Sequence, residues 1–257
     1  MLNKDIIWNE SNYKNFITYL YQKKDSDKFI DFSKELIFTK YEMIGIKVPI
    51  LRSIAKQISK TDIYSFLEIV RSNIYEEIML EGLVISYIKD YNIFKKYFNK
   101  FIKKIDNWSI CDVCISSMKI VKKYKDEFLI DIKKYLKSDD EFIVRVGVIL
   151  LLDFYIEDKY IDEIFKLIDS INKEEYYINM AIAWLISVCF IKQKEKTLKY
   201  LENNNLSIFT HNKAIQKIRE SKRVTEEEKN IATKLKKWYI ITCRMKIGVM
   251  IYGTTWN

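Results

Sequence analysis

The sequence predicts an all-α fold, built from stacked helical hairpins, on three observations. The 257 residues include only 5 Gly and 1 Pro, whereas a sheet protein of this length would need many more turn residues. Apolar residues recur with a period near 3.6 in one segment after another, which is typical of amphipathic helices. Short polar breaks separate these segments, and 49% of the residues are hydrophobic, which is enough to bury a core.

Helical periodicity runs through most of the chain, and we expect about fourteen helices of roughly 10 to 17 residues each. The clearest helical segments are 63–70, 78–88, 110–121, 142–155, 161–171, 178–191 and 214–218. The polar breaks between helices include 59–62, 137–140 and 203–205. Thr225 and Glu228 have the spacing of a capping box, which predicts a further helix from there to about residue 237.

The lengths of these helices indicate a repeat architecture. A helix pair with its links takes roughly 40 residues, which is the size of a HEAT repeat. We therefore predict an α-α superhelix, a HEAT-like repeat solenoid with a concave basic groove, as a single domain over residues 1–237. Residues 238–257 contain two of the five Gly and two of the five Trp, and we treat them as an atypical C-terminal tail.

Two kinds of helix are expected in each hairpin. Segments 146–152 and 181–190 are apolar almost throughout, so we expect them in inner helices that neighbours bury on all sides. Segments 122–136 and 192–201 are more amphipathic, so we expect them in outer helices.

The charge balance favours a polyanionic partner. The formal net charge is +9 and the pI is about 9.1, which suits nucleic acid or an anionic membrane. No uncharged stretch of 18 apolar residues occurs, and the first twelve residues lack the apolar core of a signal peptide. We therefore expect a cytoplasmic protein that makes no membrane contact.

The four cysteines give only a weak signal for a metal. Cys111 and Cys114 have the spacing of a zinc or redox pair, but zinc would need two more ligands and the only histidine is His211. No strand pattern precedes the pair, as a redox motif would require. We interpret all four, including Cys189 and Cys243, as buried small side chains in a reducing compartment, and we predict no metal site.

Four residues stand out on the apolar helices. Trp108 and Asp112 lie one helical turn apart, Arg145 follows Trp108 by 37 residues, and Trp184 follows Arg145 by 39. Residues one repeat apart occupy similar places in a solenoid, so all four can line one concave wall. Each also has an ordinary interpretation: the two Trp as core aromatics, Asp112 as a partner of Lys119, and Arg145 as a partner of an acid in 139–141.

Five segments of the sequence form a specific combination: 45–52 (GIKVPILR), 105–112 (IDNWSICD), 142–145 (FIVR), 179–184 (NMAIAW) and 210–221 (THNKAIQKIRES). In these segments the sequence resembles the AlkD-like family of DNA alkylation-repair glycosylases, and the resemblance extends from about residue 41 to residue 236. It implies a HEAT-like superhelix that cradles duplex DNA and hydrolyses the N-glycosidic bond of N7-alkylguanine and N3-alkyladenine, without metal or redox cofactor.

The resemblance also implies roles for the four residues. Asp112 matches the family's catalytic carboxylate, and Trp108 and Trp184 match two aromatics that contact the sugar of the lesion. Arg145 matches an arginine that binds the DNA backbone beside the lesion. One position departs from the pattern: some members have a second aromatic directly before the catalytic tryptophan, where this chain has Asn107.

Basic residues gather in two regions. Residues 89–137 hold 13 Lys against 6 acidic residues, and residues 210–237 hold 9 Lys and Arg against 4 Glu. Both regions are candidate phosphate-binding stripes, and in the second we single out Lys213, Lys217 and Arg219 for DNA binding.

The predicted function is therefore a monofunctional, metal-free DNA glycosylase, expected to be a monomer with alkylated double-stranded DNA as its partner. A cationic alkylated purine leaves as a neutral base, so the reaction needs stabilisation of the sugar cation rather than a general acid. Two alternatives stay open: a non-catalytic HEAT-repeat DNA-binding module, and a HEAT scaffold for a protein partner, which would have an apolar inner groove.

Overall fold

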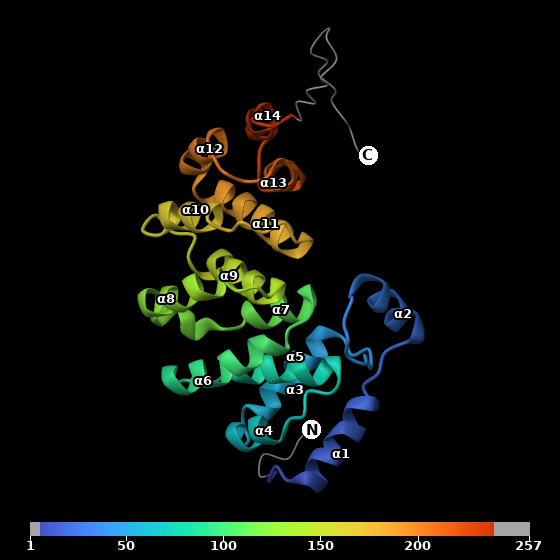
Figure 1. Ribbon diagram of the computed structural model, residues 1–257. Coiled ribbons are helices and arrows are strands. Elements are labelled where there is room, and N and C mark those ends of the chain that lie inside the picture. Colours follow the sequence, from blue (N-terminus) through green and yellow to red (C-terminus); the bar gives the residue numbers. More distant parts are fainter. Residues whose placement is uncertain (1–5, 239–257) are drawn as a thin grey trace. The chain divides into compact units, whose positions relative to one another are not determined.

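The computed structural model describes residues 6–238 and is helical from one end of that range to the other (Figure 1). Within this range the chain forms fourteen α-helices and two short 3-10 helices, with no strand, and Glu42 and Ile74 make an isolated bridge. The prediction of an all-α fold of the α-α superhelical class is confirmed. The tail predicted for 238–257 lies outside the described residues except for Trp238, which is exposed.

The chain forms two compact units, one up to Leu150 and one from Leu151. The single-domain prediction for residues 1–237 stays a prediction. The first unit contains the helices α1 (Glu10–Tyr21), α2 (Asp27–Leu36), α3 (Val48–Ile58), α4 (Ile63–Ile69), α5 (Tyr75–Ile85), α6 (Tyr91–Phe101), η1 (Ile102–Lys104), α7 (Trp108–Ile115), η2 (Lys119–Lys123), α8 (Lys125–Tyr135) and most of α9 (Glu141–Phe154). The second contains α10 (Ile161–Asp169), α11 (Tyr176–Lys192), α12 (Lys194–Glu202), α13 (Ile208–Glu220) and α14 (Glu226–Lys234).

Most helix boundaries follow local capping chemistry. The predicted capping box is present: the Thr225 hydroxyl accepts from the Glu228 N–H, and the Glu228 carboxylate accepts from the Thr225 N–H. The predicted break at 59–62 also holds, since Asp62 caps α4 by accepting from the N–H groups of Tyr64 and Ser65. A side-chain acceptor of this kind satisfies an otherwise unpaired N–H of the first helical turn.

Two predicted helices were misplaced, and the reason is visible in both. The segment 78–88 forms a helix that starts earlier, at Tyr75, because the Glu77 carboxylate accepts from the Ile74 N–H at the N-cap. The segment 110–121 contains a short helix that ends at Ile115 and is followed by η2. The hydroxyls of Ser116 and Ser117 donate to the Val113 carbonyl at this end. Serine side chains that bond to nearby carbonyls compete with continuation of a helix. The described α-helices run from 7 to 17 residues, so the expected lower limit of 10 was too high.

The core of the first unit centres on α5, all of whose residues are buried. This helix packs against α3, α6 and α7. Gly82 allows the close approach, since a Cβ there would lie 2.4 Å from the Cζ atom of Phe101. In the second unit α11 has the corresponding place and packs against α12 and α13.

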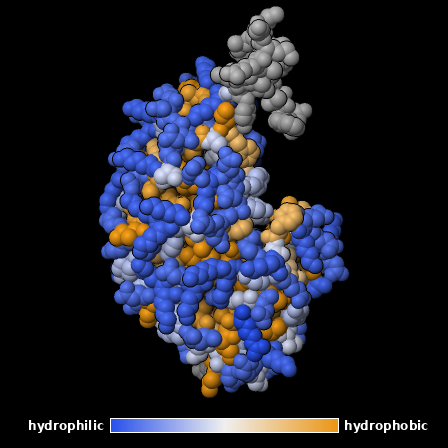
Figure 2. Space-filling model, viewed as in Figure 1, coloured by the Kyte–Doolittle hydropathy of each residue, from blue (hydrophilic) through white to orange (hydrophobic). Residues whose placement is uncertain are grey.

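The predicted inner segments 146–152 and 181–190 lie in α9 and α11, whose side chains there are mostly buried. Hydrophilic side chains cover most of the face shown in Figure 2, with hydrophobic ones visible between them. No described helix is long and apolar enough to cross a membrane.

Candidate functional site

The start of α7 fixes the position of Trp108, its first residue. Asn107 is the N-cap, and its side-chain oxygen accepts from the Ile110 N–H at 2.9 Å. The Asn107 amide also donates to the Asp106 carboxylate at 2.8 Å, and the residue is only 1% exposed. Asparagine is among the best N-cap residues, so the departure from the family pattern at this position has a clear structural role.

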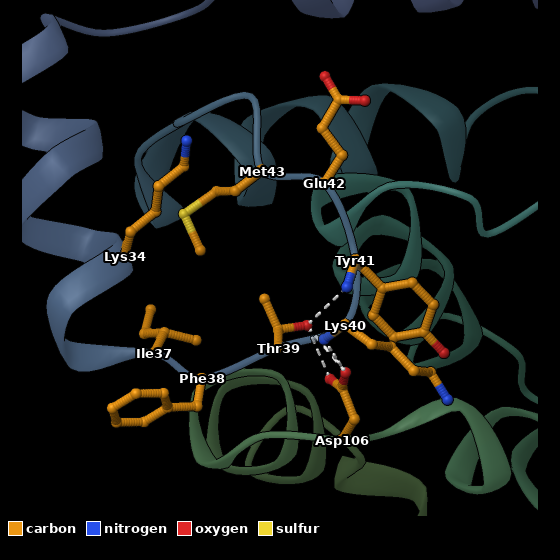
Figure 3. A pocket seen from close by; sticks show the side chains of 9 residues that line it. All are labelled: Lys34, Ile37, Phe38, Thr39, Lys40, Tyr41, Glu42, Met43 and Asp106. Carbon is orange, nitrogen blue, oxygen red and sulfur yellow. Dashed lines mark hydrogen bonds between the residues drawn. The ribbon is translucent and has the colours of Figure 1, made fainter.

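Asp106 ties the start of α7 to the loop that follows α2 (Figure 3). Its carboxylate accepts from the Thr39 hydroxyl at 2.9 and 3.0 Å and from the Lys40 N–H at 2.8 Å. The same residues line a cavity of about 600 Å³. Trp108, which is partly exposed, donates from its indole nitrogen to the Leu36 carbonyl at 3.1 Å. The indole is therefore held by contacts to the end of α2 as well as by its own helix.

Asp112, one turn after Trp108, forms an ion pair with Arg145 of α9. Arg145 Nε donates to one carboxylate oxygen at 3.0 Å, and Nη2 donates to the other at 2.7 Å. The Arg145 side chain is 6% exposed, whereas that of Asp112 is 17% exposed. This two-pronged geometry fixes the orientation of the carboxylate plane, and the more exposed member of the pair is the carboxylate.

The pair differs from the ordinary interpretation considered for Asp112. This carboxylate pairs with Arg145 rather than with Lys119, and the contact joins α9 to α7. Burial alone would lower the pKa of Arg145, but the hydrogen bonds and the charge of Asp112 outweigh it and raise that pKa. The predicted contact of Arg145 with a DNA phosphate stays a prediction.

Trp184 lies in the second unit. It is 38% exposed on α11, a helix whose other residues between 181 and 190 are mostly buried. It is therefore no ordinary core aromatic. The structure brings Trp108, Asp112 and Arg145 together in the first unit, and the prediction that Trp184 shares one wall with them stays a prediction.

One comparison with known proteins identifies the family. The model of a family described as DNA alkylation repair enzyme matches residues 18–218, well over half of the 257 residues. The chain belongs to this family. The resemblance inferred from the sequence motifs is thereby confirmed. A search of curated proteins finds no match.

A DNA alkylation repair enzyme needs cations for the phosphate backbone, and three were predicted on α13. Lys213 and Lys217 lie four residues apart and are partly exposed, while Arg219 is exposed on another face of the helix. Lys213 donates to the Gln216 side chain at 2.8 Å. No carboxylate partner of these three residues occurs in the described range, so their charges are available to bind phosphate groups. Their contact with DNA stays a prediction.

Other polar groups of this DNA repair family member have structural places. His211 lies in the first turn of α13 and is buried, with Nε2 2.7 Å from the Leu235 carbonyl. Cys111, Cys114 and Cys189 are buried and free, and burial raises the pKa of each thiol. Cys243 lies outside the described residues. Within the described range no group of three or more His, Cys, Asp or Glu side chains is arranged to hold a metal ion.

Sequence reasoning missed several polar residues that build the site of this DNA alkylation repair enzyme. Asp106 and Thr39 position the start of α7, and Arg52 of α3 donates to the Val113 carbonyl and the Ser117 hydroxyl. Three buried glutamates of α5, Glu76, Glu77 and Glu81, were also missed. Charged residues inside the apolar run 74–88 were the available signal, since buried charges always need partners.

Proposed function

We propose that this protein is a monofunctional DNA glycosylase that hydrolyses the N-glycosidic bond of cationic alkylated purines, such as 7-alkylguanine and 3-alkyladenine, in duplex DNA. The proposal rests on membership of the DNA alkylation repair enzyme family and on one observation of the structure. That observation is the Asp112 carboxylate, which Arg145 holds in one orientation while it keeps an exposed edge one helical turn from Trp108.

The chemistry needs one well-placed negative charge. As the bond between C1′ of the deoxyribose and the purine nitrogen breaks, its electron pair neutralises the positive charge of the base, so no general acid is required. Positive charge then builds on the sugar ring, and an oriented carboxylate stabilises it. A water oxygen bonds to C1′ and loses a proton to the solvent or to Asp112, which leaves an abasic site and a free base.

The neighbouring residues support that step. Electron-rich indole faces attract a cation, and the resemblance assigns this role to Trp108 and Trp184. Arg145 acts as a positioning residue, since its bidentate contact sets the orientation of Asp112. Because the carboxylate is the more exposed partner, its field dominates on the open side even though the ion pair as a whole is neutral.

The direct test uses duplex DNA with a single 7-methylguanine. Incubation with the protein should release free 7-methylguanine, detected by chromatography and mass spectrometry, and should leave a strand that breaks only after alkali treatment. The unmodified duplex is the matched control and should release no base. If the protein binds the modified duplex and frees no base, the non-catalytic DNA-binding module is the correct description.

A further inference from the structure

A second cavity of the first unit, separate from the one in Figure 3, is lined by an unusual number of cations. It measures about 880 Å³ and lies among α3, the ends of α5 and α7, and η2. Its lining includes four serine hydroxyls and no carboxylate, within the part of the chain that the structure describes. The lining cations are Arg52, Lys56, Lys89, Lys119 and Lys123.

The cavity adjoins the candidate site through Arg52. This side chain donates to the Ser117 hydroxyl at 2.8 Å and to the Val113 carbonyl at 3.2 Å. Val113 directly follows Asp112, and Ser116, another lining residue, is the C-cap of α7 one turn further on. Four residues of helix span about 6 Å along the axis, so the lining residue Ser116 lies one turn along α7 from Asp112.

The cations of the cavity are not balanced by the protein. None of the five is ion-paired with a carboxylate among the described residues, and all five are exposed. Lys123 lies over the Tyr124 ring, which offers only a weak attraction. The C-terminal ends of α5 and α7 at Ser86 and Ser116 supply partial negative charge, but each helix end is equivalent to only about half an elementary charge. About one negative charge thus opposes five positive ones.

We propose that this cavity binds phosphodiester groups of the DNA strand that passes the candidate site, and thereby sets the position of the lesion relative to Asp112. This inference rests on the proposed function for the identity of the strand. Charge complementarity supports it, because cations without carboxylate partners match a polyanion. Successive phosphates of one strand lie about 3.4 Å apart along the duplex axis, so the one helical turn between Asp112 and Ser116 corresponds to about two phosphates.

The test uses the full-length protein with the double substitution Lys56→Gln and Lys119→Gln. Both lysines are exposed and have no carboxylate partner among the described residues, so the fold should survive. Affinity for an undamaged duplex is measured by fluorescence anisotropy from about 50 to 200 mM salt. The slope of log affinity against log salt should become shallower by about 0.9 for each phosphate that the variant no longer neutralises.

The matched control is Lys60→Gln with Lys166→Gln, which removes two exposed lysines that do not line the cavity. It should leave the slope unchanged. An unchanged slope in the cavity variant, or an equal change in the control, overturns the proposed phosphate site. The experiment measures binding alone, so its outcome is independent of the proposed function. A shallower salt slope in the cavity variant, together with no base release by the wild type, would overturn the glycosylase proposal and support the phosphate site.

Discussion

Two neighbouring helices of the first unit, α5 and α7, both carry carboxylates in apolar surroundings and use them differently. On α5, Glu76 is fully buried and accepts from the backbone N–H groups of Ile44, Gly45 and Ile46 at 2.7 to 3.1 Å. These N–H groups converge because Gly45 has a φ of +92°, a conformation that suits glycine. The carboxylate of Glu76 therefore fixes a loop.

The carboxylate of α7 is paired with Arg145 and keeps an open edge. Asp112 takes one hydrogen bond on each oxygen from Arg145 and remains 17% exposed. A carboxylate oxygen can accept about two hydrogen bonds, so Asp112 can still accept a water or face a substrate cation. The comparison teaches that burial alone does not mark a catalytic acid. What matters is the hydrogen-bonding capacity of the carboxylate that the fold leaves unused.

The largest expected effect is on the rate of base release, which should depend on Asp112 and not on Glu76. Asp112→Asn keeps the shape of the side chain and removes its charge, so release of 7-methylguanine should fall by roughly two orders of magnitude or more. Binding of duplex DNA should survive or improve, because a negative charge has left the site of a polyanion. Single-turnover release at saturating protein measures the rate, and anisotropy measures the binding.

The matched variant for this experiment is Glu76→Gln, which replaces the fully buried acid of α5 in the same unit. Its rate should stay within a few fold of the wild-type rate. Since Arg145 is buried, Asp112→Asn removes one charge from a largely buried ion pair, which costs up to about 3–5 kcal/mol. Both rates are therefore measured at a temperature where circular dichroism shows folded protein. An Asp112→Asn variant as fast as wild type would discard the proposed mechanism.

The free energy of unfolding should respond to Glu76→Gln even though the rate of base release does not. Gln at position 76 keeps an acceptor for the N–H groups of Gly45 and Ile46 but turns an amide N–H₂ toward the Ile44 N–H. One buried donor is then left unsatisfied, at a cost of about 1–3 kcal/mol. Urea unfolding should show this loss in Glu76→Gln with an unchanged m-value. A variant as stable as wild type would mean that the loop does not depend on this carboxylate.

These two helices also mark what the sequence could predict. Periodicity and capping predicted the all-helical fold, because both depend on residues a few positions apart. Trp108 and Asp112 could be placed one turn apart for the same reason. The Arg145 contact to Asp112 and the Asp106 contact to Thr39 join residues 33 and 67 positions apart, and no local pattern encodes such a pairing. Glu76 and Glu77 interrupted the apolar pattern at the start of α5, which displaced the predicted helix.

The two tryptophans should have smaller effects than Asp112. A cation over an aromatic ring is stabilised by about 0.5–2 kcal/mol, so Trp108→Ala and Trp184→Ala should each lower the rate of base release by less than Asp112→Asn does. Trp108→Phe sharpens the test, since it keeps a ring and loses only the hydrogen bond to the Leu36 carbonyl. If Trp108→Phe is as slow as Trp108→Ala, the indole acts through its anchoring rather than through its face.

The smallest expected effect concerns a buried titratable group outside both helices, His211 of α13. Nε2–H donates to the Leu235 carbonyl at 2.7 Å, and Nδ1 lies 3.1 Å from the Asn204 amide nitrogen, so the neutral ring is satisfied. Burial, aided by the charge of Lys237, lowers the pKa of His211.

The sign of its pH dependence follows from that shift. In the unfolded chain His211 binds a proton below its ordinary pKa of about 6.5, whereas in the folded protein it stays neutral to a lower pH. The folded state therefore has its full stability above about pH 6.5 and loses stability as the pH falls toward the lowered pKa of the folded state. The slope is at most about 1.4 kcal/mol per pH unit for one proton. Urea unfolding between pH 5 and 7.5 should show it in the wild type. Because His211 is the only histidine in the chain, His211→Gln should flatten this part of the profile, and a slope near pH 6 that persists in the variant would assign it to another group.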